Sequence, residues 1–271
     1  MARVAGGPKH EAPSGSFAPR VLNAPRSGPA IVALHGFGGS ALAFDRIARA
    51  LTNVAALWSA DGFGHRGVPW PDHVHDFVSG LRAVRALIRD VPAPRYLLGY
   101  SMGARIGLSA WAEEPSLFVG ATLIGVHPGF DSETERAARR RLDAERSAAL
   151  RARGIDAFFA AWDRNPLFVG RDTRHMTWRD DHDPEALARA LEIWSLGHQP
   201  DLRPELGGMC AAHRAQLLVG LGDEKFRRLL APWRPRTLPG SHDLVTASPD
   251  RVARAVQTHR SMLASLGPDG A

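Results

Sequence analysis

A serine between two glycines is the most chemically suggestive feature of the sequence. Gly99-Tyr-Ser-Met-Gly103 has the pattern G-x-S-x-G, and the apolar run Tyr96-Leu-Leu98 precedes it. Where such a serine reacts, it lies on a strained turn between a strand and a helix, and glycines on either side leave room for that turn. The pattern therefore predicts that Ser101 is a reactive hydroxyl at the end of a buried strand.

A serine of this kind needs an acid and a histidine later in the chain, in that order. Asp223 ends the apolar run that begins at Gln216, and His242 lies in a Gly-Ser-His loop before the last helix. Asp223 alone could equally be the N-cap of the helix that follows it. Asp243 is a poorer acid, because it is adjacent to the histidine in the chain. Together the residues predict a catalytic triad of Ser101, Asp223 and His242.

A glycine-rich loop supplies the second half of the predicted site. His35-Gly-Phe-Gly38 follows the apolar run Ala30–Leu34. By analogy with other serine enzymes, the backbone N–H groups of Phe37 and Met102 would stabilise a developing oxyanion. His35 and Tyr100, which flank these donors, are candidates for substrate binding.

The remaining patterns predict the fold. Apolar runs alternate with segments of helical periodicity, which indicates a parallel sheet covered on both faces. This is an α/β arrangement, and with the triad it predicts an α/β-hydrolase fold. From about Gly129 the chain reads as helices, starting with a capping box at Ser132 and Glu135 and an Arg-rich helix to about Arg153. We expect a flexible leader at 1–20, a core at 21–128 and 209–271, and an inserted helical lid at 129–208.

Composition excludes several classes of protein. The 271 residues are 44% hydrophobic, and no apolar run is long enough for a membrane span. The net charge of +6 comes from arginines that are interspersed with acids, so nucleic-acid binding is not expected, whereas small anionic molecules are. Cys210 is the single cysteine, and His73 and His75 lack the partners of a metal site. We expect a cytoplasmic monomer or weak dimer with no metal and no organic cofactor.

Several motifs carry a resemblance to one family. They are Tyr100–Arg105, Glu135–Arg139, Trp162 with Pro166–Phe168, Ser195–Leu202 and Gly222–Phe226. From about Ile31 to the last helix, the chain resembles 2-succinyl-6-hydroxy-2,4-cyclohexadiene-1-carboxylate synthase, the lyase of menaquinone biosynthesis. This family eliminates pyruvate from a cyclohexene substrate that carries several carboxylates. The motifs of the lid are more specific than the triad, because ordinary esterases do not share them.

The resemblance implies roles for individual residues. Ser101 would act as the base that removes a ring proton, activated by His242, rather than as an acylated nucleophile. Arg105, Arg139 and Arg179 would bind substrate carboxylates, and Trp162 would form an aromatic wall. Taken singly, each arginine could instead be an ordinary solvated residue.

Two departures from the family pattern bear on the substrate. Asp163 stands where the family often has tyrosine, and it would repel bound carboxylates. The family's Asp-Leu-Pro-Gly-His-Gly loop reads Asp61-Gly-Phe-Gly-His-Arg66 here. Two other functions stay open: a serine hydrolase of small esters or C–C bonds, and a catalytically silent binding protein that retains the fold.

Overall fold

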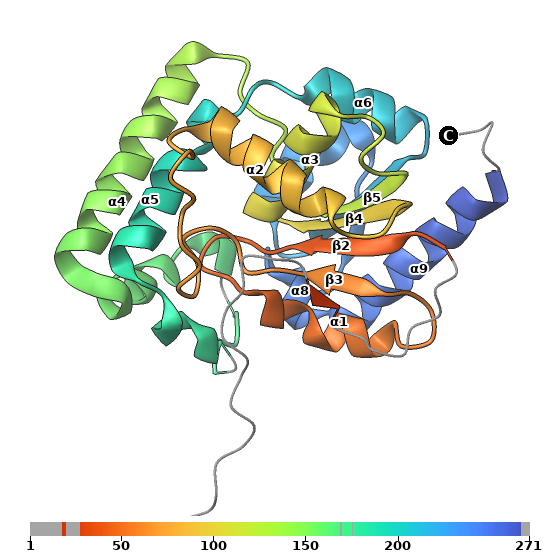
Figure 1. The fold of residues 1–271 in the computed structure, drawn as a ribbon, viewed down its shortest axis with the longest axis horizontal. Helices are drawn as coiled ribbons and strands as arrows, with labels where there is room; N and C mark the ends of the chain where they lie inside the picture. The colour runs from red at the N-terminus through yellow and green to blue at the C-terminus, as the bar shows by residue number, and fades with distance from the viewer. Residues whose placement is uncertain (1–17, 20–27, 169, 175, 267–271) are drawn as a thin grey trace, which may run out of the picture.

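A central sheet with helices on both faces forms the core of the computed structural model (Figure 1). The structure describes residues 18–19, 28–168, 170–174 and 176–266. Within them the strand order is β1-β3-β2-β4-β5-β6-β7, and every neighbouring pair is parallel except β1 with β3. The strands are β1 Ala18–Pro19, β2 Ala30–Leu34, β3 Leu57–Ser59, β4 Arg95–Tyr100, β5 Gly120–Ile124, β6 Ala215–Gly220 and β7 Arg236–Leu238.

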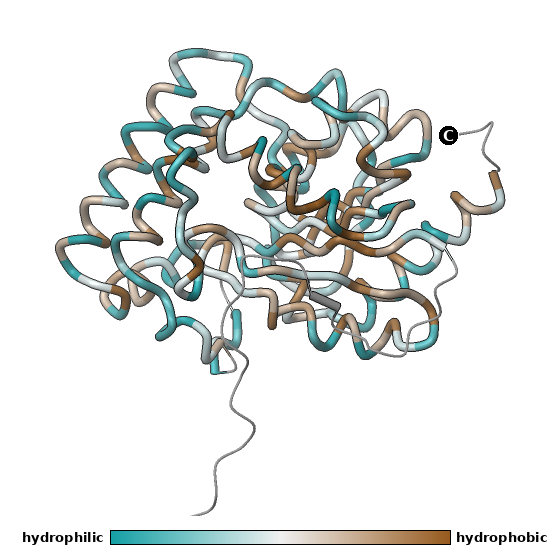
Figure 2. The backbone as a smooth tube through the Cα atoms, in the orientation of Figure 1, coloured by the Kyte–Doolittle hydropathy of each residue, from teal (hydrophilic) through white to brown (hydrophobic). Residues whose placement is uncertain are grey.

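The inner strands are hydrophobic on both faces because helices cover both faces. In β4, Leu97 joins the core on one side of the sheet, whereas Tyr96 and Leu98 join the core on the other. Successive side chains of a strand point to opposite faces, so an uninterrupted apolar run is what a doubly covered strand requires. Figure 2 shows the hydrophobic residues concentrated along these central strands.

Two groups of helices make up the covering layers. Residues of α2 Phe77–Arg89, α3 Met102–Glu113, α6 Arg203–Ala211 and α7 Glu224–Leu230 join the first core. Residues of α1 Asp45–Ala50, α8 Leu244–Ala247 and α9 Pro249–Leu266 join the second. Short 3₁₀ helices lie at η1 Ala41–Phe44 and η5 Ala231–Trp233.

One of these helices begins later than its periodicity predicts. The apolar pattern predicts a helix from His73, but α2 starts at Phe77. Asp76 accepts a hydrogen bond from Ser79 N, and Asp76 N donates to Ser79 Oγ, which is a reciprocal capping box. The cap satisfies the first backbone donors of the helix and so fixes where it begins.

The predicted lid is a group of helices set beside the sheet, at the left of Figure 1. Its longest helix runs to Trp162, beyond the predicted end at Arg153, and is interrupted at Gly154, where φ is 77° and ψ is 178°. Arg151 pairs with Glu185 and Glu192, and so fastens this helix to its neighbour. The elements are α4 Glu133–Trp162, η2 Pro166–Phe168, η3 Thr177–Asp181, α5 Pro184–Ile193 and η4 Leu196–His198.

The two ends of the lid meet at one point of the core. Leu202 N donates to Pro128 O over 2.7 Å, although more than seventy residues separate the two in the chain. The predicted boundary between residues 208 and 209 falls inside α6. Leu206 of this helix is fully buried in the same core as Leu217 of β6. The chain has therefore returned to the core by about Leu202, earlier than the sequence predicts.

The described residues cover little of the predicted leader at 1–20. Only Ala18 and Pro19 are described, and they pair with Trp58 and Ser59 of β3. The rest of the leader lies outside the described residues. No helix in the described part of the chain is long and apolar enough to cross a membrane.

Candidate active site

Ser101 lies on the sharp turn that its sequence predicts. It joins β4 to α3 with φ 52° and ψ −110°, a conformation that costs energy for a residue with a side chain. The flanking residues must be glycines, because other backbone atoms lie too close to leave room for a side chain. A Cβ on Gly103 would lie 2.2 Å from Leu34 O, and one on Gly99 would lie 2.5 Å from Ala104 Cα. The G-x-S-x-G pattern therefore reflects the space that this turn leaves.

The structure brings Ser101, His242 and Asp223 together. His242 Nε2 lies 3.1 Å from Ser101 Oγ, and His242 Nδ1 lies 2.6 Å from Asp223 Oδ2. The histidine and the aspartate are each 2% exposed. With the proton on Nδ1, the histidine donates to the carboxylate and can accept the proton of the serine hydroxyl. This is the geometry that activates a serine.

Both interpretations of Asp223 hold at once. Its Oδ1 accepts a hydrogen bond from Phe226 N and so caps α7, while its Oδ2 holds the histidine. Asp243 instead caps α8 by accepting from Thr246 N. The helix cap and the contact with His242 use different oxygens of one carboxylate, and the cap fixes the orientation of the acid that faces the histidine.

The predicted oxyanion donors lie beside the serine. Phe37 and Met102 line the same cavity as Ser101. Neither N–H donates a hydrogen bond to another described residue. Two unused backbone donors beside a serine hydroxyl can stabilise negative charge on a substrate oxygen.

His35 and Tyr100, the two other candidates near the serine, make different kinds of contact. His35 is buried, its Nδ1 contacts Gly36 O at 2.8 Å, and its Nε2 accepts from Gly62 N at 2.8 Å. Both ring nitrogens thus contact backbone groups, and the ring joins two loops. The residue also lines the small cavity at Ser101. Tyr100 packs its ring 5.6 Å from the ring of His242 and lines the same small cavity as Ser101.

A larger cavity of about 420 Å³ also opens at Ser101, and Arg105 forms part of its wall. The Arg105 guanidinium donates to Gln199 Oε1 at 3.1 Å and to Trp194 O at 2.9 Å, and both acceptors are neutral. Burial, together with the nearby charge of Arg139, lowers the pKa of Arg105 to about 9. No described carboxylate lies within salt-bridge distance of this guanidinium. Arg105 is therefore a buried cation with no salt bridge to a described carboxylate, and Asp143 is the acid whose charge reaches it. It lies at the wall of the cavity that holds the serine.

Arg139 lines the same cavity, but its charge is shared. It donates to Asp143 Oδ2 over 2.7 Å, and this buried aspartate also accepts from Arg146 and Ser195. The basic residues that line the cavity nevertheless outnumber the acids, because Arg105, Arg139, Arg146 and Lys225 face only Glu135. The cavity favours an anion.

Arg179 is placed beside Ser101, but on the small cavity of about 50 Å³. It holds Asp163 through two hydrogen bonds, of 2.5 and 2.9 Å, and Arg171 binds the same carboxylate. Burial alone would raise the pKa of Asp163, but the hydrogen bonds and charges of the two arginines outweigh it and the pKa lies below its ordinary value. Asp163 is thus neutralised by its neighbours, and the repulsion that the sequence suggests is absent from this arrangement.

Trp162, which the resemblance assigns to an aromatic wall, lies among aromatic rings at the site. It lines both cavities, and its ring lies 5.1 Å from the Phe37 ring, 5.4 Å from the Phe158 ring and 6.1 Å from the Phe168 ring. The last residue of α4 thereby brings the lid against the oxyanion loop.

Sequence reasoning missed four residues of the site: His127, Arg146, Arg171 and Lys225. His127 is buried, and burial together with nearby cations, Arg105 foremost, lowers its pKa to about 3. Lys225 had a signal, because it belongs to the Gly222–Phe226 motif. The two arginines had none, since nothing in the chain separates them from the surface arginines around them.

The sequence predicts that His73 and His75 do not form a metal site. In the described part of the chain no group of three His, Cys, Asp or Glu residues is placed to hold a metal ion. His73 and His75 contact each other through His75 Nδ1 and His73 O at 3.0 Å, on an exposed loop.

Comparisons with known proteins identify the family of the chain. Residues 31–255 match the family model described as the alpha/beta hydrolase family. The 2-succinyl-6-hydroxy-2,4-cyclohexadiene-1-carboxylate synthase of Escherichia coli O1:K1 / APEC is 32% identical over 208 residues, which cover 75% of this chain and 81% of the relative.

Solved structures share the fold at lower identity. MenH from S. aureus has a TM-score of 0.80 at 21% identity, covering 93% of this chain and 100% of that one. A structure from a study of carboxylesterases of Nitrososphaera gargenis has a TM-score of 0.72 at 18% identity, covering 92% of this chain and 94% of that one. The chain is therefore an enzyme of the alpha/beta hydrolase family and, within it, belongs to the 2-succinyl-6-hydroxy-2,4-cyclohexadiene-1-carboxylate synthases.

Proposed function

We propose that the enzyme eliminates pyruvate from 2-succinyl-5-enolpyruvyl-6-hydroxy-3-cyclohexene-1-carboxylate, the lyase step of menaquinone biosynthesis. The observation that carries this proposal is Arg105, a buried guanidinium bonded only to neutral groups, on the cavity wall beside Ser101. A buried cation without a counter-ion is costly unless the ligand supplies the anion. Simple esters offer no such anion, whereas the proposed substrate carries several carboxylates.

The triad supplies the base. His242 Nε2 takes the hydroxyl proton of Ser101, and the serine oxygen then removes the ring proton α to the succinyl ketone. The electron pair of that C–H bond becomes the enolate, whose oxygen is held by Phe37 N–H and Met102 N–H. When the enolate collapses, a new ring double bond forms and the C–O bond to the enolpyruvyl group breaks. The imidazolium proton passes to the leaving group, which becomes pyruvate, and the serine keeps the ring proton until it exchanges.

The charges of the site suggest how the anion is oriented. Arg179 and Arg171 are both engaged by Asp163, so the small cavity offers little net positive charge. Arg105, with Lys225 at the rim, makes the large cavity the cationic side. We infer that the substrate's carboxylates lie mainly on the large-cavity side of Ser101.

The serine-hydrolase alternative uses the same groups differently. In a hydrolase Ser101 Oγ attacks a carbonyl, and an acyl-enzyme forms that water must cleave. The fold does not decide between the two reactions, because lyases and hydrolases share it. A catalytically silent binding protein is disfavoured by the assembled triad.

The deciding experiment offers both kinds of substrate to the purified enzyme. We expect pyruvate release from the enolpyruvyl cyclohexene acid, slow turnover of p-nitrophenyl esters and no adduct on Ser101 by mass spectrometry. Ser101→Ala should reduce pyruvate release by roughly 10³-fold or more, because the base is lost while the binding groups remain. Fast ester cleavage with a trapped Ser101 acyl adduct and no pyruvate would establish the hydrolase instead.

A further inference from the structure

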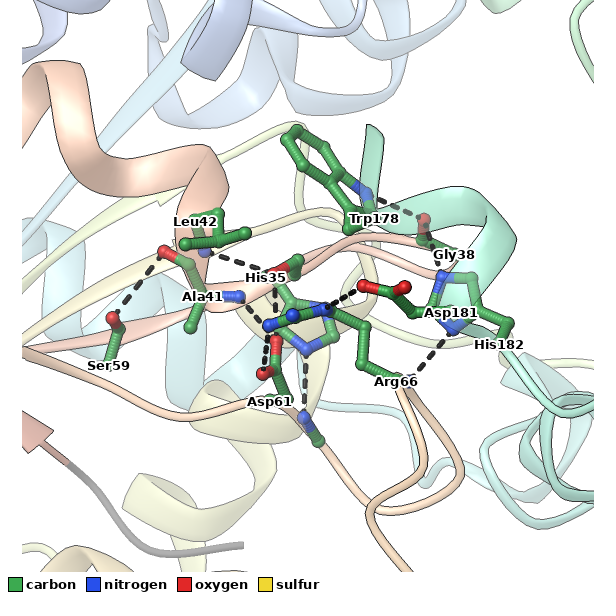
Figure 3. A network of polar contacts seen from close by, with 12 residues as sticks. His35, Gly38, Ala41, Leu42, Ser59, Asp61, Arg66, Trp178, Asp181 and His182 are labelled. Atoms are coloured by element: carbon green, nitrogen blue, oxygen red, sulfur yellow. Dashed lines mark hydrogen bonds and ion pairs between the residues drawn. The ribbon is translucent and has the colours of Figure 1, made fainter. Parts of the chain in front are cut away.

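The oxyanion loop, residues 35–39, is held by side chains from outside it. Gly38 N donates to His65 Nε2 over 3.2 Å. Gly38 O accepts from Trp178 Nε1 at 3.3 Å and contacts His182 Nε2 at 3.3 Å (Figure 3). His65, Trp178 and His182 are all buried. Both polar atoms of the Gly38 backbone are therefore fixed by neighbouring elements.

The direction of each bond follows from the other ring nitrogen. His182 Nδ1 accepts from Arg66 N at 3.0 Å, so the proton of the ring is on Nε2, which donates to Gly38 O. His65 Nδ1 contacts Phe63 O at 3.1 Å, so it carries the proton, and Nε2 accepts from Gly38 N. Burial lowers the pKa of both rings, which keeps them neutral as these bonds require.

These contacts bear directly on the Phe37 donor. Gly39 N donates to Gly36 O, so residues 36–39 form a turn in which Phe37 is the second residue. Gly38 has φ +64° and can rotate more freely than other residues. Fixing both of its polar atoms fixes the peptide planes that follow Phe37, and with them the turn that aims the Phe37 N–H.

Two of the three groups come from the lid. Trp178 lies in η3 and His182 directly follows it, whereas His65 belongs to the loop after β3. The Arg66 side chain donates to Asp61 at 2.9 Å and to Asp181 at 3.1 Å, so it links the end of η3 to the same loop. These hydrogen bonds make the shape of the oxyanion loop depend on the position of η3.

We propose that Trp178 and His182 are positioning residues that couple the seating of the lid to the assembly of the oxyanion hole. The inference rests on the proposed function only in that an oxyanion forms during the reaction. When η3 is seated, the N–H donors of Trp178 and of the adjoining His182 hold Gly38 O, and the Phe37 N–H is aimed at the cavity. When η3 lifts, both donors leave and the turn loses that constraint, so the lid controls catalysis as well as access.

Substitutions that remove hydrogen-bond donors, compared with a matched control, separate this role from packing. Trp178→Phe keeps an aromatic ring but removes the donor together with part of the indole volume. His182→Asn keeps an acceptor near the Nδ1 position for Arg66 N but removes the donor to Gly38 O. His182→Gln places its amide near the Nε2 position and should keep that donor. Trp70→Phe is the matched control, because Trp70 Nε1 donates over 3.0 Å to Ala186 O of α5, a bond of the same kind across the same boundary but away from the loop.

The first measurement is hydrogen exchange of the backbone amides in residues 36–41, followed by mass spectrometry without substrate. We expect the combined Trp178→Phe and His182→Asn variant to exchange at least about tenfold faster than wild type in this segment, because local opening becomes easier. Trp178→Phe alone should show a smaller increase, and Trp70→Phe none. An unchanged exchange rate in both Trp178→Phe and the combined variant would refute the coupling.

The second measurement is steady-state kinetics with whichever substrate the wild-type enzyme turns over, the enolpyruvyl acid or a p-nitrophenyl ester. The combined variant should lose about tenfold or more in kcat with KM within about twofold, because a misaimed donor acts in the transition state. Replacing His182→Asn by His182→Gln in the Trp178→Phe background should restore most of kcat. A loss confined to KM, or an equal loss in Trp70→Phe, would overturn the proposal. Failure of the proposed function would appear separately, as no pyruvate from wild type.

Discussion

At the scale of single residues, the three arginines that the family resemblance selects are not equivalent. Arg139 and Arg179 each have a carboxylate partner within the protein, Asp143 and Asp163 respectively. Arg105 has only neutral partners. A substrate carboxylate gains most from the cation that has no counter-ion, since it displaces nothing. The structure therefore ranks residues that the sequence alone treats alike.

We expect Arg105→Ala to cost the most in kcat/KM, roughly 2 to 5 kcal/mol, because it removes the buried partner of a charged group. Arg179→Ala should cost less, since Asp163 already neutralises that guanidinium. Arg105→Lys should restore activity only in part, because an ammonium lacks the planar fork. Steady-state kinetics of the three variants show the order of their losses in kcat/KM. An Arg105→Ala variant within about twofold of wild type would remove Arg105 from the site.

The sequence predicts the triad at residue level because each member belongs to a local pattern. Ser101 has its two glycines, and Asp223 and His242 each follow a strand-like run. It could not predict that Asp163 is neutralised by Arg171 and Arg179, because that arrangement depends on where η3 and the residues before it fold back. The spacing of residues along the chain predicts where strands end and where helices are capped. Contacts between segments of the lid depend on the tertiary structure and cannot be predicted in this way.

At the scale of elements, the sequence predicts the order and most of the bounds, and it fails where a local feature overrides periodicity. The helix predicted from His73 starts at Phe77 because of the Asp76 cap, and the helix predicted to end near Arg153 resumes after Gly154. No side-chain pattern marks that interruption. The lid boundary shifts to about Leu202 because α6 packs on the sheet, which periodicity alone does not reveal.

Gly154 offers a test at this scale. Its φ of 77° and ψ of 178° belong to a region that residues with a Cβ avoid, although no atom lies within 4 Å of a Cβ built there. Gly154→Ala should therefore lower the free energy of unfolding by about 1 to 3 kcal/mol through backbone strain alone. Gly208→Ala is the matched control, because Gly208 lies in α6 with equal open space and should be neutral or slightly stabilising. Urea denaturation compares them, and equal stabilities would contradict the strain.

At the scale of the whole molecule, buried neutral histidines tie stability to pH. Burial lowers the pKa of His182 to about 4, against the opposing effect of its bond to Gly38. The groups that face it are His35, His65, Asp61 and Arg66. The unfolded chain binds a proton at this histidine below about pH 6.5, while the folded protein does so only below about pH 4.

The free energy of unfolding should therefore fall as the pH drops from about 6.5 to about 4, and His182 should contribute on the order of 3 kcal/mol to that fall. Below about pH 4 its contribution levels off. His182→Gln, which cannot be protonated, should show a shallower decline. Urea denaturation across this range, with circular dichroism, gives the slopes. Identical slopes for wild type and His182→Gln would contradict the prediction.

The hydrogen bond from Leu202 N to Pro128 O has an evolutionary consequence. The chain leaves the core at Pro128 and returns to it beside the same residue, at Leu202. The helices between these two residues therefore form one contiguous insertion, here called the cassette. Insertions or deletions within the cassette need not change the strand order, or the strands that precede Ser101 and Asp223, although Leu167 of the cassette accepts a hydrogen bond from His242 N. New substrate preferences can thus arise by replacing one contiguous stretch of coding sequence. The triad residues Ser101, Asp223 and His242 lie outside that stretch.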